Sequence, residues 1–144
     1  MKRGYKAALV VLTWAAAGAA QAFNIKATSE NPMESVDALR AATLQAASAV
    51  GVAIPDNPNI KVTVFTRAQS SKIGQGQYIY LHRIELRRAF NGPTPPYPFA
   101  GWLPIQTTEQ YGVGDEKQVS ADLDAVLKKF FTEVKAIDPN VGIK

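Results

Sequence analysis

The sequence predicts an α+β domain in which two helices pack on one face of a small, three-stranded antiparallel sheet. Two long stretches, one towards each end of the chain, carry apolar residues at helical spacing, and three stretches between them have the alternation of strands. The order helix, strand, strand, strand, helix favours this class over an alternation of strands and helices. Residues 23–28 alternate weakly and are either a fourth, short edge strand or an irregular start.

The first 22 residues have the pattern of a secretory signal peptide. Three basic residues precede an apolar stretch at residues 7–20, and Ala20-Gln21-Ala22 matches a small-x-small cleavage site. The apolar stretch is shorter than the roughly 20 residues that a spanning helix needs. We therefore expect cleavage after Ala22, no membrane anchor afterwards, and one domain over residues 23–144 in the periplasm or outside the cell.

Charge and cysteine content narrow the classes of function. The chain has 16 basic and 12 acidic residues, but three of the basic ones lie in the leader, so the mature chain is nearly neutral. This balance gives no support for nucleic acid or an anionic membrane surface as a partner. The absence of cysteine excludes disulfides, thiolate catalysis and cysteine-based metal sites. No cofactor is expected.

The first helix is predicted to follow Asn31 as its N-cap, with Pro32 as the first helical residue and Glu34 completing a capping box. Gly51 is predicted to end it in the left-handed conformation. The stripe facing the core has a three- and four-residue spacing and consists of Val36, Leu39, Thr43, Ala46 and Val50.

Two strands follow, joined by a polar loop at residues 67–76. The first, residues 60–66, directs Ile60, Val62 and Val64 to one face, which is expected to meet the helices. The second, residues 77–88, is the longest stretch of strand character. Its even-numbered positions are mostly apolar, whereas its odd-numbered positions change from apolar to charged. This pattern predicts a central strand with one covered and one partly open face.

Residues 91–99 contain four prolines and two aromatic residues, so they are expected to be extended and outside any central ladder. A third strand is predicted over residues 101–108, at a sheet edge because Pro104 interrupts it. Residues 111–114 are predicted to be a turn.

The last helix is predicted to begin after Asp115, an N-cap with Gln118 three residues further on. Its apolar residues form one continuous stripe: Val119, Leu123, Val126, Leu127, Phe130, Phe131, Val134 and Ile137.

Several segments together resemble a loose group of small, exported bacterial proteins of uncharacterised function with an α-β-β-β-α core. They are Gly51-Val52-Ala53-Ile54 after the first helix, the strands around Val62 and Tyr80, Gly101-Trp102, and Asp138-Pro139-Asn140 after the last helix. The group commonly has Thr-Trp where this chain has Gly101-Trp102. The resemblance implies a fold and a compartment, and it implies no functional residue.

His82, the single histidine, is the candidate for acid–base chemistry. Its neighbours on the same strand face, Tyr80 and Ile84, predict that it points into the core or to the rim of a pocket. A core histidine satisfied by a hydrogen bond is the favoured alternative, because no Gly-x-Ser-x-Gly motif accompanies it. One histidine without cysteine also makes a metal site unexpected.

These observations favour a non-enzymatic envelope protein that binds a protein or another envelope component. The expected surface joins the open sheet face to the segment 91–102, because aromatic residues are favoured interface anchors. Its residues are Lys61, Phe65, Ile79, Leu81, Arg83, Tyr97, Phe99 and Trp102. For the last three, the alternative is that they cover one end of the core.

Three other possibilities stay open from the sequence. Exposed sheet edges permit strand addition by a partner or by a second copy of the chain. A small hydrolase or ligand-binding protein would place His82 in a cleft between sheet and helices. An inhibitor or immunity protein would share the features of a binding protein.

Overall fold

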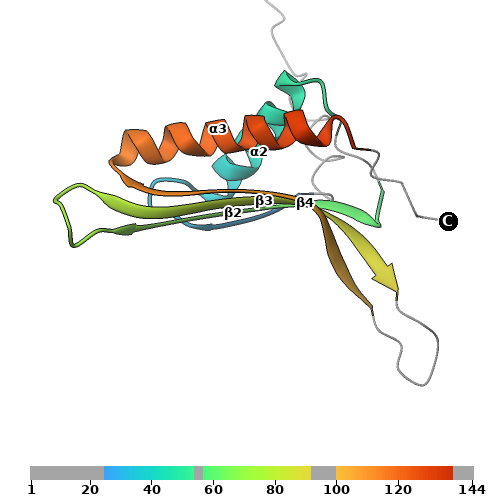
Figure 1. The fold of residues 1–144 in the computed structure, drawn as a ribbon, viewed down its shortest axis with the longest axis horizontal. Helices are drawn as coiled ribbons and strands as arrows, with labels where there is room; N and C mark the ends of the chain where they lie inside the picture. The colour runs from blue at the N-terminus through green and yellow to red at the C-terminus, as the bar shows by residue number, and fades with distance from the viewer. Residues whose placement is uncertain (1–24, 54–56, 92–99, 138–144) are drawn as a thin grey trace, which may run out of the picture.

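The computed structural model describes residues 25–53, 57–91 and 100–137 of the chain. They form an α+β fold in which two helices lie on one face of a four-stranded sheet (Figure 1). The elements are β1 (Ile25–Glu30), α2 (Val36–Ala49), β2 (Ile60–Ser70), β3 (Tyr78–Asn91), β4 (Ala100–Gly114) and α3 (Glu116–Val134). The predicted leader lies outside the described residues. Neither α2 nor α3 is long and apolar enough to cross a membrane.

The sheet is mixed, with the strand order β1-β2-β3-β4. β2, β3 and β4 are antiparallel neighbours as predicted, but β1 pairs with β2 in parallel. The prediction of a purely antiparallel sheet is therefore wrong. The parallel pair arises because α2 carries the chain back across the sheet between β1 and β2, as parallel pairing requires. At six residues, β1 is too short for its alternation to be decisive.

The two ends of α2 differ in how well they were predicted. Ser35, rather than Asn31, is the N-cap, and its Oγ accepts a hydrogen bond from the Ala38 amide at 3.1 Å. Asn31 instead closes the preceding turn, because its Oδ1 accepts from the Met33 amide at 3.0 Å. The predicted left-handed residue Gly51 is confirmed by its φ of 74°.

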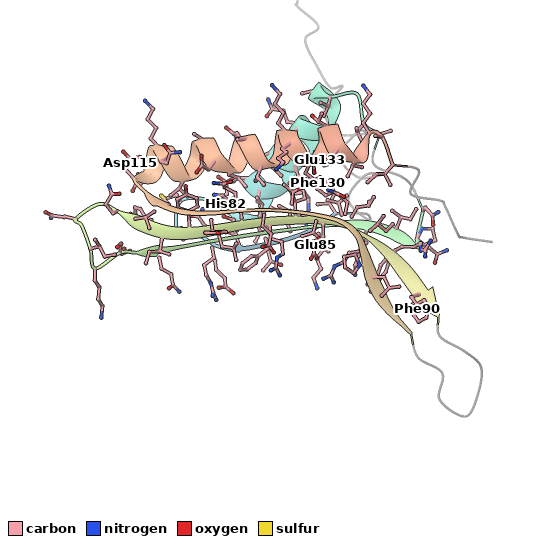
Figure 2. All side chains as sticks on the ribbon, in the orientation of Figure 1. His82, Glu85, Phe90, Asp115, Phe130 and Glu133 are labelled. Atoms are coloured by element: carbon pink, nitrogen blue, oxygen red, sulfur yellow. The ribbon has the colours of Figure 1, made fainter. Side chains whose placement is uncertain are left out.

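The core lies between the helices and the even-numbered face of β2 and β3. The predicted cap of α3 is confirmed, since Asp115 accepts from the Gln118 amide at 2.8 Å. Figure 2 shows Phe130 between α3 and the sheet. Buried residues from five elements make up the main core: Ile25; Leu39 and Ala47; Ile60, Val62 and Val64; Ile84 and Leu86; Leu123, Val126, Leu127, Phe130, Phe131 and Val134.

β4 is much longer than predicted, because residues 111–114 continue the strand instead of forming a turn. The glycine at position 112 serves close packing: a Cβ there would lie 2.5 Å from Oη and 2.8 Å from Cζ of Tyr80. The prediction of a turn at residues 111–114 is therefore wrong, because the glycines there belong to a strand. The predicted edge position of the strand containing Pro104 is confirmed by the strand order.

The β3–β4 pair bends sharply near its middle. The pairing register shifts between Leu86 and Arg87, as in a β-bulge, and beyond this point the two strands turn away from the helices (Figure 1). Trp102 lies on the bent part, opposite Ala89. The bend therefore encloses one end of the sheet face that the helices leave uncovered.

We expect Gly112→Ala to lower the free energy of unfolding by about 1–3 kcal/mol, because the added methyl group overlaps the Tyr80 ring. Urea unfolding followed by circular dichroism measures the loss. In a Tyr80→Leu background the ring is absent, so the same glycine substitution should have a much smaller effect. Equal losses in the two backgrounds would contradict the contact as the cause.

Candidate functional site

His82 is fully buried between β3 and α3 (Figure 2). Its Nδ1 lies 2.8 Å from the hydroxyl oxygen of Thr66, and its Nε2 lies 3.0 Å from the backbone carbonyl of Val119. The described residues line a hollow on the sheet face opposite the helices and a cavity of about 260 Å³ between α2 and α3. The His82 side chain lines neither of them. His82 therefore contacts the core and not a described cavity.

The hydrogen bonds of His82 define its tautomer. A carbonyl can only accept, so Nε2 carries the proton that bonds to Val119, and Nδ1 accepts from the Thr66 hydroxyl. Thr66 Oγ1 in turn accepts from Asn31 Nδ2 at 3.2 Å. Burial lowers the pKa of His82, while the Val119 carbonyl and the charge of Asp122 oppose this effect. A neutral, fully bonded histidine thus links β2, β3 and α3, and through Thr66 it also connects to Asn31 directly after β1.

Tyr80 extends this buried polar group. Its ring packs against His82 with the centroids 5.2 Å apart, and its hydroxyl donates a hydrogen bond to Asp122. Burial, followed by the bond to Asp122, raises the pKa of Tyr80 to about 12. Asp122 also accepts from Gln118 at 2.8 Å. These polar groups hold α3 on the sheet.

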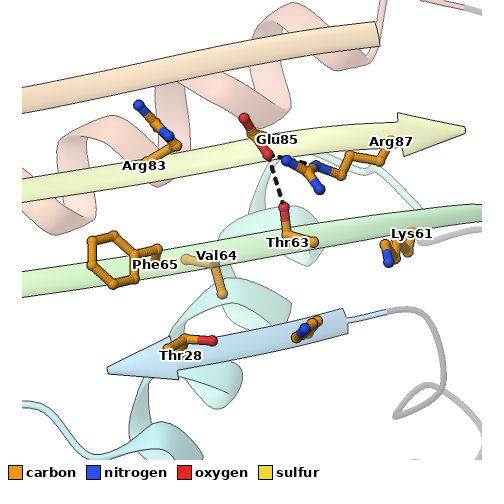
Figure 3. Close-up of a pocket in the computed structure, with 9 residues that line it drawn as sticks. Thr28, Lys61, Thr63, Val64, Phe65, Arg83, Glu85 and Arg87 are labelled. Carbon is orange, nitrogen blue, oxygen red and sulfur yellow. Dashed lines mark hydrogen bonds and ion pairs between the residues drawn. The ribbon is translucent and has the colours of Figure 1, made fainter. Parts of the chain in front are cut away.

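A hollow with a volume of about 340 Å³ lies on the sheet face opposite the helices. Figure 3 views this face with the helices behind the strands. Three strands contribute the lining residues: Lys26 and Thr28; Lys61, Thr63, Val64 and Phe65; Arg83, Glu85 and Arg87. The alternation of side chains along each strand places these residues on one face, with Val64 contributing at the floor.

The lining side chains form rows across the strands. Lys61 pairs with Arg87, and Phe65 lies between Thr28 and Arg83. In the middle row, Thr63 is flanked by Lys26 on β1 and by Glu85 on β3. The centre of the hollow is therefore surrounded by cations from all three strands.

Two acidic residues neutralise two of the four cations. Arg87 Nε donates to Glu85 Oε2 at 2.6 Å, and the hydroxyl of Thr63 donates to the same oxygen at 3.3 Å (Figure 3). Arg83 forms an ion pair with Glu109 on β4. Within the part of the chain that the structure describes, Lys26 and Lys61 form no ion pair.

The ammonium group of Lys61 has an unusual environment. Its Nζ lies 3.8 Å from the centre of the Trp102 ring, a cation–π contact. Burial lowers the pKa of Lys61, and the neighbouring charges of Lys26 and Arg87 lower it further. The contact with Trp102 keeps this cation beside the hollow instead of extending freely into water.

An apolar cluster lies on the same face, towards the β2–β3 hairpin. Ile79 pairs with Val113 and Leu81 with Tyr111, so the four side chains adjoin across β3 and β4. Ile79, Val113 and Tyr111 are 52%, 54% and 78% exposed. We call Ile79, Leu81, Tyr111 and Val113 the apolar cluster.

The structure brings several of the predicted surface residues together. Phe65 and Arg83 line the hollow, and Trp102 lies beside it at 36% exposure, outside the core. Tyr97 and Phe99 lie outside the described residues.

Sequence reasoning missed residues on β1 and β4. Lys26 and Thr28 lie in β1, which the sequence predicted only as one of two alternatives. Their spacing of two residues is the pattern that indicates a shared strand face. Tyr111 and Val113 were assigned to a turn, although Thr107, Glu109, Tyr111 and Val113 alternate as a strand would.

No family model matches this chain, and a search of curated proteins found no match either. Among residues 25–53, 57–91 and 100–137, no group of three or more histidine or acidic side chains is placed to hold a metal ion.

Proposed function

We propose that this is an exported, non-enzymatic binding protein of the cell envelope, whose partner is a protein or another envelope component. The partner contacts the open face of the sheet. One observation supports this proposal above the others: the helices cover one sheet face, while the opposite face combines a hollow with the exposed apolar cluster.

The apolar cluster is the first part of the argument. Three large apolar side chains that are each more than half exposed adjoin on two neighbouring strands. Single exposed apolar residues are common, but a contiguous group on one face is typical of an interaction site. Tyr111, at 78% exposure, has the amphipathic ring that is favoured as an interface anchor.

The positions of the reactive side chains are the second part. His82 and Tyr80 point towards the helices, and their polar atoms are used in contacts that hold α3 on the sheet. Glu85, the carboxylate of the hollow, is engaged by Arg87 and Thr63. These contacts favour binding over catalysis for the open face.

Site-specific photo-crosslinking in the envelope of the source cells tests the proposal. A photoreactive residue at Ile79 or Tyr111 should give a discrete adduct, whereas one at Val36 should not. Val36 was predicted to face the core, but it is 39% exposed at the start of α2, and it is therefore a matched apolar control. The double substitution Ile79→Thr/Tyr111→Thr should reduce adduct formation from the neighbouring Val113 position by at least about tenfold, since it removes the apolar contact area. Equal adducts from all positions, or none, would contradict the proposal.

A further inference from the structure

We propose that the hollow on the open sheet face binds a phosphate group carrying two negative charges, such as a phosphate monoester. Lys26, Lys61 and Arg87 hold this group. The inference rests on the proposed function, because it names the ligand chemistry of one part of the same binding face.

The first supporting observation is the placement of like charges. Lys61 and Arg87 are directly paired across β2 and β3, and Lys26 adjoins them through Thr63. Like charges opposite one another on a sheet are destabilising. Glu85 relieves part of this repulsion at Arg87, but Lys61 is partly buried, so fewer water molecules screen its charge than at a fully exposed position. A bound anion would convert the repulsion into attraction.

The second observation is the charge that remains after pairing. Glu85 neutralises Arg87 and Glu109 neutralises Arg83, which leaves the two positive charges of Lys26 and Lys61. A phosphate monoester carries a charge of about −1.5 to −2 at neutral pH and therefore matches the pair. A single carboxylate would leave one of the lysines uncompensated.

The third observation is that two of the three donors, Arg87 and Lys61, are already positioned. Glu85 engages Arg87 through Nε, and the guanidinium carries further N–H donors on its two terminal nitrogens. The Trp102 ring holds the Lys61 ammonium from one side at 3.8 Å. Fixing such long side chains before binding reduces the entropy lost when the ligand binds.

The size of the hollow is also suitable. Its volume of about 340 Å³ falls within the range of ligand-binding pockets, near the lower end. It therefore accommodates a phosphate group together with part of the molecule to which the phosphate is attached. Phe65 lines the hollow beside Arg83 and offers an apolar contact to that attached part.

Titration at low ionic strength tests the inference. Inorganic phosphate and glycerol 3-phosphate are the soluble probes, and acetate at equal ionic strength is the singly charged comparison. Wild type should show saturable changes in the backbone amide signals of Thr63 and Glu85 with both phosphates, and a several-fold weaker response to acetate.

Vesicles of phosphatidylcholine with and without phosphatidic acid form a second arm of the experiment. Binding to the soluble probes identifies a small phosphorylated molecule as the source, and binding to phosphatidic acid vesicles alone identifies a lipid headgroup.

The decisive variant is Lys26→Gln/Lys61→Gln. It should bind phosphate at least about tenfold more weakly, because two charge-assisted contacts are lost. Without ligand it should stay folded, because the loss of like-charge repulsion offsets the loss of the Lys61–Trp102 contact, so a folding defect is not expected to obscure the result. The control Lys117→Gln/Lys128→Gln makes the same change of charge on exposed positions of α3 and should bind as wild type does.

Unchanged phosphate binding by the Lys26/Lys61 variant would overturn the inference, and so would the absence of saturable binding in both arms. These results are distinct from failure of the proposed function. The Ile79→Thr/Tyr111→Thr variant should retain phosphate binding while losing its partner. If crosslinking to the partner succeeds and no phosphate probe binds, only the ligand assignment fails.

Discussion

Replacing Phe130 with alanine is expected to lower the free energy of unfolding by about 3–5 kcal/mol. The ring is fully buried between α3 and the sheet and packs edge-to-face on Phe131 with the centroids 5.1 Å apart. Its removal loses both apolar burial and the contacts of the surrounding side chains, which cannot close the cavity completely. Because small domains are stable by only about 5–15 kcal/mol, this variant should unfold at a much lower urea concentration.

Tyr111→Ala is the control for Phe130→Ala. It also removes an aromatic ring, but one that is 78% exposed on the open face, so stability should change by less than about 0.5 kcal/mol. Circular dichroism in urea gives both values. Similar losses for the two variants would show that α3 does not cover the main core.

His82→Ala is expected to destabilise the fold by roughly 3 kcal/mol near neutral pH. The substitution leaves a cavity and removes the hydrogen bonds to the Thr66 hydroxyl and the Val119 carbonyl, so the Thr66 O–H loses its acceptor in the core. His82→Gln should lose less, because its amide can still donate a hydrogen bond. If His82→Ala unfolds at the wild-type urea concentration, the buried polar group contributes nothing to stability.

The same histidine predicts a pH dependence. Burial lowers the pKa of His82 in the folded state below its ordinary value of 6.5, so the unfolded chain binds the proton more readily. The free energy of unfolding should therefore be constant with respect to this group above about pH 7 and should fall as the pH drops below about 6.5. His82→Gln lacks the titrating group and should lose this slope. Parallel profiles for the two proteins between pH 7 and pH 5 would contradict the assignment.

The covered side of the molecule could largely be predicted from the sequence. Apolar spacing predicts burial directly, because the core accepts almost only apolar side chains. This holds for the stripe from Val119 to Val134 and for the alternation at Ile60, Val62 and Val64. The capping residue Asp115 and the left-handed Gly51 follow from local hydrogen bonding and backbone geometry, which short motifs encode.

The open side could be predicted only in part, for identifiable reasons. The parallel pairing of β1 depends on contacts with β2, which no short-range pattern records. The role of the glycine at position 112 depends on Tyr80, which lies 32 positions away in the printed sequence. The pairing of Phe65 with Arg83 follows from the hairpin, whereas the approach of Lys61 to Trp102 depends on the bend of β3 and β4. Long-range geometry of this kind leaves little trace in local composition.

The bend and Pro104 also affect how β4 can meet another sheet. A long edge strand offers a row of amide donors and carbonyl acceptors to any passing chain, and this invites uncontrolled aggregation. In β4, a proline without an amide hydrogen stands next to the register shift, where the regular spacing of the ladder is interrupted. A second sheet could not dock continuously along all 15 residues of this strand. The geometry that encloses one end of the open face thus also works against edge-to-edge polymerisation.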